Sequence, residues 1–403
     1  MIDWTSHYAG RAKRMTASEI RELLKVLDQP DLISFAGGIP DPALFPVAEI
    51  AGAYAKVLND PAQAKIALQY AVSEGYKPLR EWIAGYMTRL GAPCGPDNVV
   101  ITNGSQQALD FLGKLFITPG DPVLVAWPTY LGALQAFNSY EPVYDVLPGP
   151  GSNRTVESYA KGKGAPRLGY CMPEFQNPTG TSLTREERLQ MLDAADAMDL
   201  PLIEDNAYEK LRYDGERVPS LLALDIARKG GIENSRVIYC GTFSKSIVPA
   251  LRIGWIVAAK PVIQKLVIVK QASDLHVSTL NQIVMHEVAS KIIEDQARRI
   301  LPVYKARRDA MLAALEAHMP RGVRWTKPEG GMFVWVTLPE GMDAAVLLER
   351  ALAEARVAFV PGIAFFADRG RGNYLRLNFS LSDEASIAEG IKRLGALIAQ
   401  MQG

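Results

Sequence analysis

The chain has 403 residues, enough for one large domain and a smaller one, and its 44 basic and 44 acidic side chains balance. This balance does not indicate a nucleic acid or an anionic membrane as a partner, and no apolar run reaches the roughly 20 residues of a membrane-spanning helix. Four histidines without metal-ligand spacing argue against a metal site. Three scattered cysteines, with no signal-peptide pattern at the start, predict a reduced, cytoplasmic protein.

The first predicted element is a helix over residues 16–28. Thr16 and Glu19 have the spacing of a capping box, and apolar residues recur behind them at helical spacing. A short extended run then leads to Gly37 and Gly38, which are followed by two prolines. This pattern predicts a fixed loop whose glycines let a ligand approach the backbone closely, although a plain turn is equally compatible with it.

From residue 98 onward, short apolar runs alternate with helical segments. The expected strands lie at 98–102, 122–126, 167–171, 201–205, 236–241 and 253–258. The expected helices between them include 105–116 and 185–198. Parallel strands need crossover connections of this kind, so the middle of the chain is predicted to be α/β, with a mostly parallel central sheet flanked by helices.

The C-terminal part alternates differently. Residues 262–315 are expected to be mainly helical, and strands are expected at 330–337 and 373–380 around a helix at 343–355. We therefore expect a smaller α+β domain, completed by the N-terminal segment packing onto it. The predicted divisions are an N-terminal segment at 1–45 that also covers the active site, a large domain at 46–315 and a small domain at 316–403.

A lysine segment follows the predicted strand at 236–241. It contains Thr242, Ser244, Lys245 and Arg252. An amine at a strand end can be partly desolvated and held near a cationic neighbour, which lowers its pKa and suits it to imine chemistry. The hydroxyls and the arginine could hold a phosphate. A single lysine is more often solvated on a surface loop, so this interpretation depends on finding other parts of the same site.

Ligands of parallel α/β sheets bind where strands end, and one such end carries a candidate anion site. Gly104, Ser105 and Gln106 follow a predicted strand and begin a helix. Backbone N–H groups and the helix dipole at this point would favour a phosphate. An ordinary N-cap by Ser105 explains the same fragment equally well.

Four further side chains follow predicted strands. Tyr130 could stack on a flat ring or pack in the core. Asn177 could donate to a phenolate or carboxylate oxygen, or simply make a turn before Pro178. Asp205 needs a partner because burying a lone carboxylate is costly, and either a protonated ring nitrogen or a helix N-terminus would serve. Tyr208 could hydrogen-bond a ring oxygen.

A phosphate site, a stacking ring, a buried carboxylate and an imine-competent lysine are the parts needed to bind pyridoxal phosphate. With these parts, the chain resembles the class I/II aminotransferases of fold type I, and most of all the 2-aminoadipate, kynurenine and branched-chain aminotransferase subgroup. The matching segments are SFAGG at 34–38, QY…EGY at 69–76, GSQQAL at 104–109, NPTG at 177–180, EDNAY at 204–208, TFSK at 242–245, RIGW at 252–255 and GGMFVW at 330–335. Thr242 departs from the family, which usually has serine there, but it keeps the hydroxyl.

The resemblance implies a set of cofactor contacts. Lys245 would form the internal aldimine with pyridoxal 5′-phosphate, Asp205 would pair with the pyridinium nitrogen, and Tyr208 would act with them at the catalytic centre. The other implied cofactor contacts are Gly104, Ser105, Gln106, Thr242, Ser244 and Arg252 around the phosphate, Tyr130 on the ring face, and Asn177 at the phenolic oxygen. No metal is implied.

The resemblance also implies substrate and partner contacts. Arg376 would bind the substrate α-carboxylate, helped by Asn177 and Gly38, and it falls on one face of the predicted strand at 373–380. Tyr70 would reach the phosphate of a neighbouring subunit, which makes the expected functional unit a homodimer. Arg21, on the N-terminal helix, would meet a distal substrate carboxylate or lie on the solvated outer face.

The expected activity is transfer of an amino group from an L-amino acid of 2-aminoadipate, glutamate, leucine or aromatic type to a 2-oxo acid such as 2-oxoglutarate. A carbon–sulfur β-lyase could use the same lysine and aspartate, and it would release pyruvate and ammonia without an oxo-acid acceptor. A cofactor-binding regulator of transcription is a remote alternative, because the site motifs begin by Gly37 and leave no room for a winged-helix module. A catalytically idle relative is disfavoured by the presence of Lys245, Asp205 and Arg376.

Overall fold

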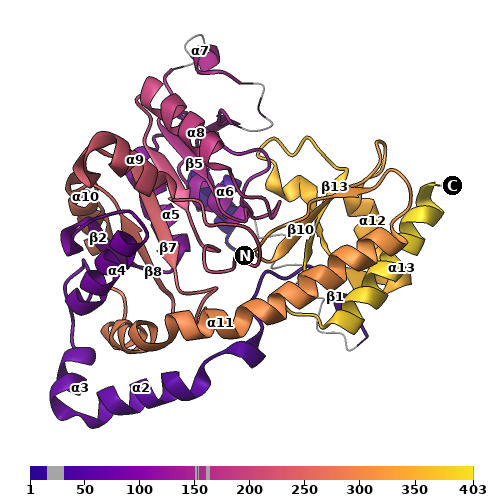
Figure 1. Cartoon of the computed structure of the whole chain (residues 1–403). Coiled ribbons are helices and arrows are strands. Elements are labelled where there is room, and N and C mark those ends of the chain that lie inside the picture. Colours follow the sequence, from indigo (N-terminus) through magenta and orange to yellow (C-terminus); the bar gives the residue numbers. More distant parts are fainter. Residues whose placement is uncertain (16–30, 150–151, 153, 160–163, 403) are drawn as a thin grey trace.

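The computed structural model of the protein describes residues 1–15, 31–149, 152, 154–159 and 164–402. A larger and a smaller lobe lie side by side, and helix α11 (Thr279–His318) runs along the edge of both (Figure 1). The predicted helix at 16–28, together with Arg21, lies outside the described residues. The predicted domain limits at 45/46 and 315/316 stay predictions.

The larger lobe is built on a sheet of seven strands in the order β2-β8-β7-β6-β5-β3-β4. The strands are β2 (Val99–Asn103), β3 (Pro122–Val125), β4 (Val143–Val146), β5 (Leu168–Cys171), β6 (Leu202–Asp205), β7 (Val237–Thr242) and β8 (Ile253–Val257). Only β8 runs antiparallel to its neighbours, β2 and β7. The prediction of a mostly parallel sheet is therefore confirmed, while the edge strand β4 was not predicted.

Helices of the larger lobe cover both faces of this sheet. The helices of this lobe are α4 (Lys77–Arg89), α5 (Ser105–Phe116), α6 (Leu131–Asn138), α7 (Val156–Tyr159), α8 (Arg185–Ala197), α9 (Leu221–Lys229) and α10 (Lys260–Gln271), with α2 (Val47–Asn59) and α3 (Pro61–Ala67) packed on α11. Buried residues of α5, α6 and α10 form one apolar cluster with the sheet, and those of α4, α8, α9 and the first part of α11 form another. Because both faces are covered, the strands are almost continuously apolar.

The smaller lobe holds an antiparallel sheet in the order β12-β13-β10-β9. Its strands are β9 (Arg324–Trp325), β10 (Phe333–Thr337), β12 (Val360–Pro361) and β13 (Tyr374–Asn378), and its helices are α12 (Ala344–Arg350) and α13 (Glu384–Gln402). In β13, Leu375 and Leu377 enter the apolar cluster under α13, while Arg376 and Asn378 face the other way and are also buried. The predicted alternation along this strand is confirmed, and it aims Arg376 at the larger lobe.

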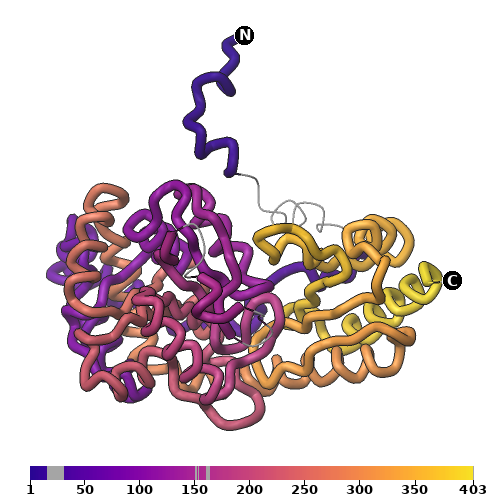
Figure 2. The backbone as a smooth tube through the Cα atoms, turned by 90° about the horizontal axis from the view of Figure 1, so that it is seen from above, coloured from indigo at the N-terminus to yellow at the C-terminus, as the bar shows by residue number. Residues whose placement is uncertain are grey.

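The N-terminal part of the chain contributes to the smaller lobe. Strand β1 (Ile33–Ser34) pairs in parallel with β11 (Val357–Ala358). Residues 1–15 form two short 3-10 turns that project from the body (Figure 2) and expose Trp4 and Tyr8. The chain just after β1 lies between the two lobes, because residues 36–38 contact Arg376 of the smaller lobe and Lys245 of the larger one, and it can line a site there.

Within the described ranges, no helix combines the length and the apolar character needed to cross a membrane. The same ranges contain no group of three or more His, Cys, Asp and Glu side chains able to hold a metal ion.

Candidate active site

Lys245 follows strand β7 and extends toward the smaller lobe. Its Nζ atom donates a hydrogen bond of 2.7 Å to the carbonyl oxygen of Gly38. Burial, and after it the positive charges of Arg376 and Arg252, lower the pKa of the amine to about 8. The amine is therefore partly deprotonated near neutral pH, which is the condition for a nucleophile.

Asp205 ends strand β6 and is 2% exposed. Its Oδ2 atom accepts a hydrogen bond of 2.9 Å from the Tyr170 hydroxyl, while its Oδ1 atom is buried without a partner. Burial raises the pKa of this carboxyl to about 6, and the Tyr170 hydrogen bond opposes the rise. No helix begins at Asp205, because the next one, α9, starts at Leu221, so the alternative of a helix N-cap is wrong.

The N-terminus of α5 forms an open cup. Gly104 is the N-cap, with φ at 75°, and no side chain caps the helix. Ser105 is the first helical residue, so the alternative of an N-cap by Ser105 is wrong. A Cβ atom on Gly104 would lie 2.3 Å from Nη2 of Arg252, so glycine is needed for the guanidinium to approach. Free backbone N–H groups beside an arginine suit a phosphate.

Two hydroxyls stand at the end of β7, close to Lys245 in the sequence. The Thr242 hydroxyl donates to Oγ of Ser244 over 2.9 Å, and the Ser244 backbone N–H donates to Oγ1 of Thr242 over 3.2 Å. Thr242 is 8% exposed. The pair presents short polar groups at the same sheet edge as Gly104, because β7 and β2 both flank β8.

Arg376 is buried at the junction of the two lobes. Its Nη1 atom donates to Oδ1 of Asn177 over 2.8 Å, and its Nη2 atom donates to the carbonyl oxygens of Ala36 and Gly37 over 2.9 and 2.8 Å. Burial lowers the pKa of the guanidinium to about 10. Its Nε atom has no partner. A buried cation with a spare donor suits an anionic ligand.

Aromatic rings surround this arginine. The guanidinium carbon lies 4.3 Å from the ring centre of Phe333 and 5.1 Å from that of Phe365. Tyr208 meets the edge of Phe333 at a centroid distance of 5.7 Å. Burial raises the pKa of the Tyr208 hydroxyl, and a hydrogen bond with Asn177 opposes the rise. Asn177 therefore joins Tyr208 and Arg376 in one cluster.

Tyr130 and Gln106 lie against the start of α6. A Cβ atom on Gly132 would come within 2.4 Å of the Tyr130 ring, so the ring rests directly on this glycine. Gln106 donates from Nε2 to the carbonyl oxygen of Gly132 over 2.7 Å. Tyr130 also lies near enough to Tyr208 and Arg376 to influence their pKa values.

Tyr70 is not brought to this cluster within a single chain. It is 80% exposed, and its ring meets the edge of His276 at a centroid distance of 5.9 Å. Arg21 lies outside the described residues, so its position relative to the cluster stays a prediction.

A comparison with protein families shows which family carries this cluster of residues. The model of the family Aminotransferase class I and II matches residues 38–394. The chain belongs to this family. It is a pyridoxal phosphate-dependent transaminase of fold type I.

Individual relatives of this aminotransferase agree over almost the whole chain. It is 45% identical to "Aromatic-amino-acid aminotransferase 1" of Thermococcus litoralis, over 99% of this chain and 95% of that protein. It is 42% identical to "2-aminoadipate transaminase" of Thermus thermophilus, over 98% and 97%. The resemblance predicted from the sequence is confirmed.

Solved structures show the same fold. The α-aminoadipate aminotransferase of Thermus thermophilus, complexed with N-(5′-phosphopyridoxyl)-L-leucine, superposes with a TM-score of 0.89 at 40% identity, covering 100% of this chain and 99% of that one. The kynurenine aminotransferase of Pyrococcus horikoshii superposes with a TM-score of 0.91 at 43% identity, with the same coverage.

The residues present in the aminotransferase fit pyridoxal phosphate. The unpartnered Oδ1 atom of Asp205 can accept from a ring N–H, and the cup between Gly104 and Arg252 can hold a phosphate. The Lys245 amine, with its lowered pKa, can attack an aldehyde. Each of these atoms offers the charge or hydrogen-bonding capacity that the corresponding part of the cofactor requires.

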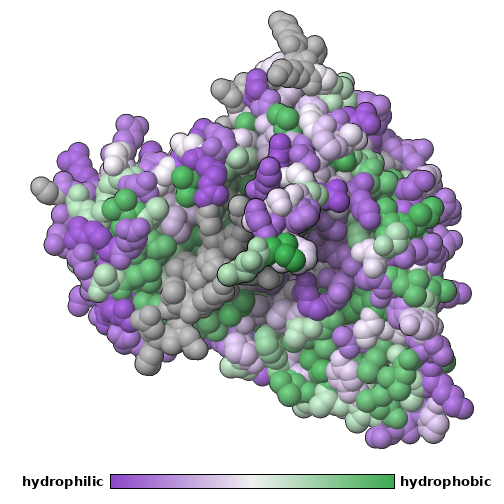
Figure 3. All heavy atoms as spheres, turned by 180° about the vertical axis from the view of Figure 1, so that it is seen from behind, coloured by the Kyte–Doolittle hydropathy of each residue, from purple (hydrophilic) through white to green (hydrophobic). Residues whose placement is uncertain are grey.

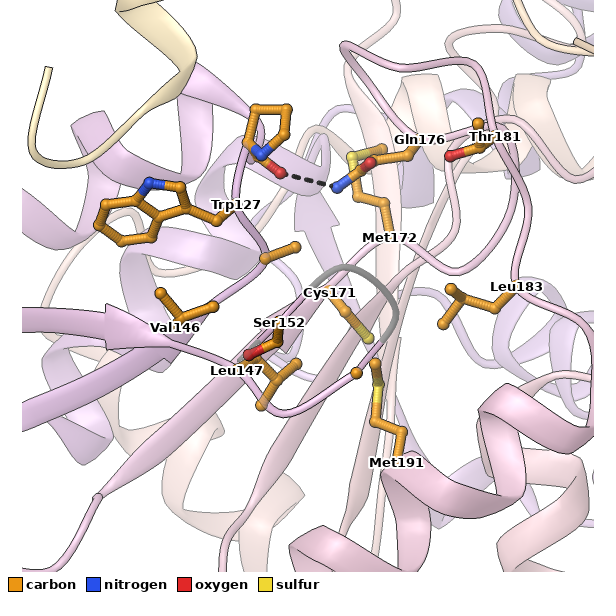
Figure 4. A pocket seen from close by; sticks show the side chains of 13 residues that line it. Trp127, Val146, Leu147, Ser152, Cys171, Met172, Gln176, Thr181, Leu183 and Met191 are labelled. Carbon is orange, nitrogen blue, oxygen red and sulfur yellow. Dashed lines mark hydrogen bonds between the residues drawn. The ribbon is translucent and has the colours of Figure 1, made fainter. Parts of the chain in front are cut away.

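A separate cavity of about 120 Å³ lies at the carboxyl ends of β3 and β5 (Figure 4). Trp127, Met172 and Met191 line it, and Gln176 closes one side by donating to the Pro128 carbonyl oxygen over 2.9 Å. Of the predicted cofactor and substrate residues that the structure describes, none lines this cavity. Lys245 and Thr242 line a smaller one, of about 20 Å³.

Sequence reasoning missed residues that support the site. Tyr170 holds Asp205, and Phe333 and Phe365 flank Arg376. Tyr170 carried a usable signal, since a hydroxyl in an otherwise apolar buried strand needs a partner. Phe333 lies in the matching segment at 330–335 but was given no role there, and Phe365 carried no signal, because buried phenylalanines look alike in a sequence.

Proposed function

We propose that this enzyme moves the amino group of an L-amino acid of 2-aminoadipate, glutamate, leucine or aromatic type to a 2-oxo acid such as 2-oxoglutarate, with Lys245 as the residue that binds pyridoxal phosphate covalently. The environment of Lys245 carries this proposal. Its amine lies between two lobes, near two arginines, and its pKa is lowered to about 8.

The surrounding residues have complementary roles in this proposal. When bound, pyridoxal phosphate supplies an aldehyde that condenses with amines and a ring that accepts electrons. Lys245 takes the α-proton of the substrate and later returns a proton to the cofactor side. The free Oδ1 atom of the charged Asp205 carboxylate accepts from the ring nitrogen and keeps it protonated. Asn177 and Tyr208, which are hydrogen-bonded to each other, hold the ring in place.

The phosphate group would be held at the carboxyl edge of the large sheet. Gly104, Ser105 and Gln106 supply the helix N-terminus, and Thr242, Ser244 and Arg252 supply hydroxyls and a guanidinium. Tyr130 would lie on the ring face, since it rests on Gly132 next to this cup. The preformed contacts among these residues support the assignment.

Substrate recognition would centre on Arg376. Its guanidinium is buried, and the carbonyl oxygens that it contacts belong to the segment beside Gly38. A substrate α-carboxylate would give this cation a stronger acceptor than backbone carbonyls. Arg21 would bind a distal carboxylate, which would make 2-aminoadipate and glutamate good donors.

We also propose a cytoplasmic homodimer. Apolar side chains gather over the part of the molecule where α2 and α3 lie (Figure 3). Exposed there are Leu58, Ile66, Leu68 and Val72, next to the exposed Tyr70. A second copy covering this surface would bury it and bring Tyr70 to the neighbouring site.

The lysine assignment is tested by loading the purified enzyme with pyridoxal phosphate and reducing it with borohydride. Peptide mass spectrometry should then find the cofactor attached at Lys245. An enzyme that stays colourless and unmodified at this lysine would refute the proposal.

The substrate class is tested with a panel of amino donors, each offered with 2-oxoglutarate or pyruvate, in wild type and Arg21→Ala. Arg21→Ala should weaken 2-aminoadipate and glutamate far more than leucine. Equal losses for all donors would remove Arg21 from the substrate site. Analytical ultracentrifugation at low and high protein concentration tests the dimer.

A further inference from the structure

Tyr170 occupies a position from which it reaches the cofactor-binding carboxylate. It lies on β5, is fully buried, and pairs in register with Ile203 of β6. Residues two apart on a strand share a face, so Asp205 projects on the same side of the sheet as Ile203. The Tyr170 hydroxyl therefore meets the Asp205 carboxylate diagonally across the two strands.

The hydrogen bond between Tyr170 and Asp205 makes the two carboxylate oxygens different. Tyr170 donates to Oδ2 over 2.9 Å, while Oδ1 is buried and has no partner. Burial, and next the Asp205 charge, raise the pKa of the Tyr170 hydroxyl well above its usual range, so the phenol keeps its proton and stays a donor. One oxygen is thus occupied by the protein and the other is left for a ligand.

We propose that Tyr170 is a positioning residue that acts through Asp205: it fixes which carboxylate oxygen meets the ring nitrogen of pyridoxal phosphate and stabilises the ionised carboxylate. This inference rests on the proposed role of Asp205. A phenol that donates to an ionised carboxylate makes a charge-assisted hydrogen bond, and it stabilises that ion against its protonated form.

The consequence concerns the proton shared by Asp205 and the ring nitrogen. In a buried site, this proton can lie on nitrogen, as an ion pair, or on oxygen, as a neutral pair. Tyr170 favours the ion pair because it stabilises the negative carboxylate. Burial raises the pKa of Asp205 to about 6 even though the Tyr170 hydrogen bond opposes the rise, so loss of the Tyr170 hydroxyl would raise this pKa further and move the proton toward oxygen. The ring would then withdraw electrons less strongly.

Tyr170→Phe is the direct test, and Tyr239→Phe is its matched control. The phenyl ring at 170 keeps the edge-to-face contact with Phe137, whose centroid lies 5.8 Å away. Tyr239 is equally buried, on strand β7, which is separated from β5 by β6, and it belongs to the apolar cluster on the opposite face of the sheet. The two substitutions remove the same atom from the same sheet, and only one removes a contact with Asp205.

The readout is the ¹⁵N chemical shift of the ring nitrogen in holoenzyme loaded with ¹⁵N-labelled pyridoxal phosphate. Wild type and Tyr239→Phe should give the signal of a protonated ring nitrogen. Tyr170→Phe should shift it toward the unprotonated value, and the rate of the first half-reaction should fall about tenfold or more. Unchanged shifts in Tyr170→Phe would overturn the proposal, and so would an equal change in Tyr239→Phe.

A second variant keeps the test independent of folding. Site-specific 3-fluorotyrosine at position 170 preserves the ring and makes the hydroxyl a stronger donor, so it should hold the ring nitrogen at least as fully protonated as in wild type at the same pH. A move in the opposite direction would overturn the proposal. If wild type itself takes up no cofactor at Lys245, the proposed function fails; if it does and only the Tyr170 effects are missing, this inference alone fails.

Discussion

The two ends of the active site are built differently. The proposed cofactor end, with Asp205 and Gly104, lies on one sheet, and Tyr170 of the adjoining strand holds Asp205. The proposed substrate end, with Arg376, joins the smaller lobe to the segment at 36–38, where the carbonyl oxygens of Ala36 and Gly37 accept from its Nη2 atom. Lys245 bridges the two ends through Gly38.

Because of this difference, the proposed cofactor end is the preorganised half of the site, and the proposed substrate end is the adjustable half. The groups around the cofactor have unfilled atoms in fixed positions, which suits chemistry that depends on electrostatic preorganisation. At the proposed substrate end, Arg376 and Lys245 donate to carbonyl oxygens of one segment, residues 36–38, and a bound carboxylate can replace these oxygens. We therefore expect changes at the cofactor end to affect mainly the chemical step, and changes at the substrate end to affect mainly the choice and affinity of the donor.

Lys245→Ala should have the largest effect, because it removes both the covalent attachment and the base. We expect turnover to fall by roughly 10⁴-fold or more, while the cofactor is still bound noncovalently. Single-turnover absorbance measurements and equilibrium dialysis of the cofactor would show this. Lys265→Ala, an exposed change on α10, is the control, and near-normal turnover in Lys245→Ala would contradict the assignment.

Asp205→Asn should come next, since it keeps the shape of the side chain but removes the charge that faces the ring nitrogen. Loss of the α-proton should slow by about 10²- to 10³-fold, with a smaller change in the KM of the donor. Stopped-flow absorbance with an α-deuterated donor would measure this step. The surface change Asp193→Asn should leave it unaltered. A pure KM effect would place Asp205 at the substrate end instead.

Arg376→Lys tests the adjustable half. Lysine keeps the charge but cannot replace the planar fork that contacts both Asn177 and the carbonyl oxygens of Ala36 and Gly37, so kcat/KM should fall by about 10²-fold, mostly through KM. Initial rates over a range of donor concentrations would separate the two terms. Arg350→Lys, on the surface of α12, is the control. A fall in kcat alone would break the proposed division between the two ends.

The pKa of Lys245 predicts a pH profile. With this pKa lowered from 10.5 to about 8, the rate at which the cofactor-free enzyme captures pyridoxal phosphate should rise with pH and level off above about pH 8. Between pH 8 and 10.5 the unfolded chain binds more protons at this group, so its contribution makes the free energy of unfolding rise with pH. Stopped-flow capture rates over a pH series that spans both values would locate the midpoint. A midpoint near 10.5 would contradict the desolvated position.

Thr242→Val should have the smallest effect. It keeps the branched shape and removes the hydroxyl that contacts Ser244, so the affinity for pyridoxal phosphate should drop about five- to tenfold. Thr242→Ser restores a hydroxyl and should stay within about threefold of wild type. Fluorescence titration of the cofactor-free protein would measure both. Equal losses in the two variants would mean that the methyl group, not the hydroxyl, matters.

The sequence predicted the parts that depend on local pattern. Strand periodicity placed β5, β6 and β7 within a residue or two, and the residues that follow them were identified as site candidates. The edge strand β4 was missed because Val143–Val146 is short and only half-buried, so its hydrophobic pattern is weak. Whether Ser105 and Asp205 cap helices are choices that could not be made from fragments.

Those choices needed the tertiary structure, because each depends on a contact between distant residues. Asp205 meets Tyr170 across two strands, and Arg376 meets Asn177 and the segment at 36–38 across the two lobes. The sequence by itself determined the family and the mostly parallel sheet, and it singled out Lys245 as the candidate reactive lysine, since periodicity and residue chemistry are properties of the chain alone. Burial decided the rest: only the folded arrangement removes water from Lys245, Asp205 and Arg376 and so sets their pKa values.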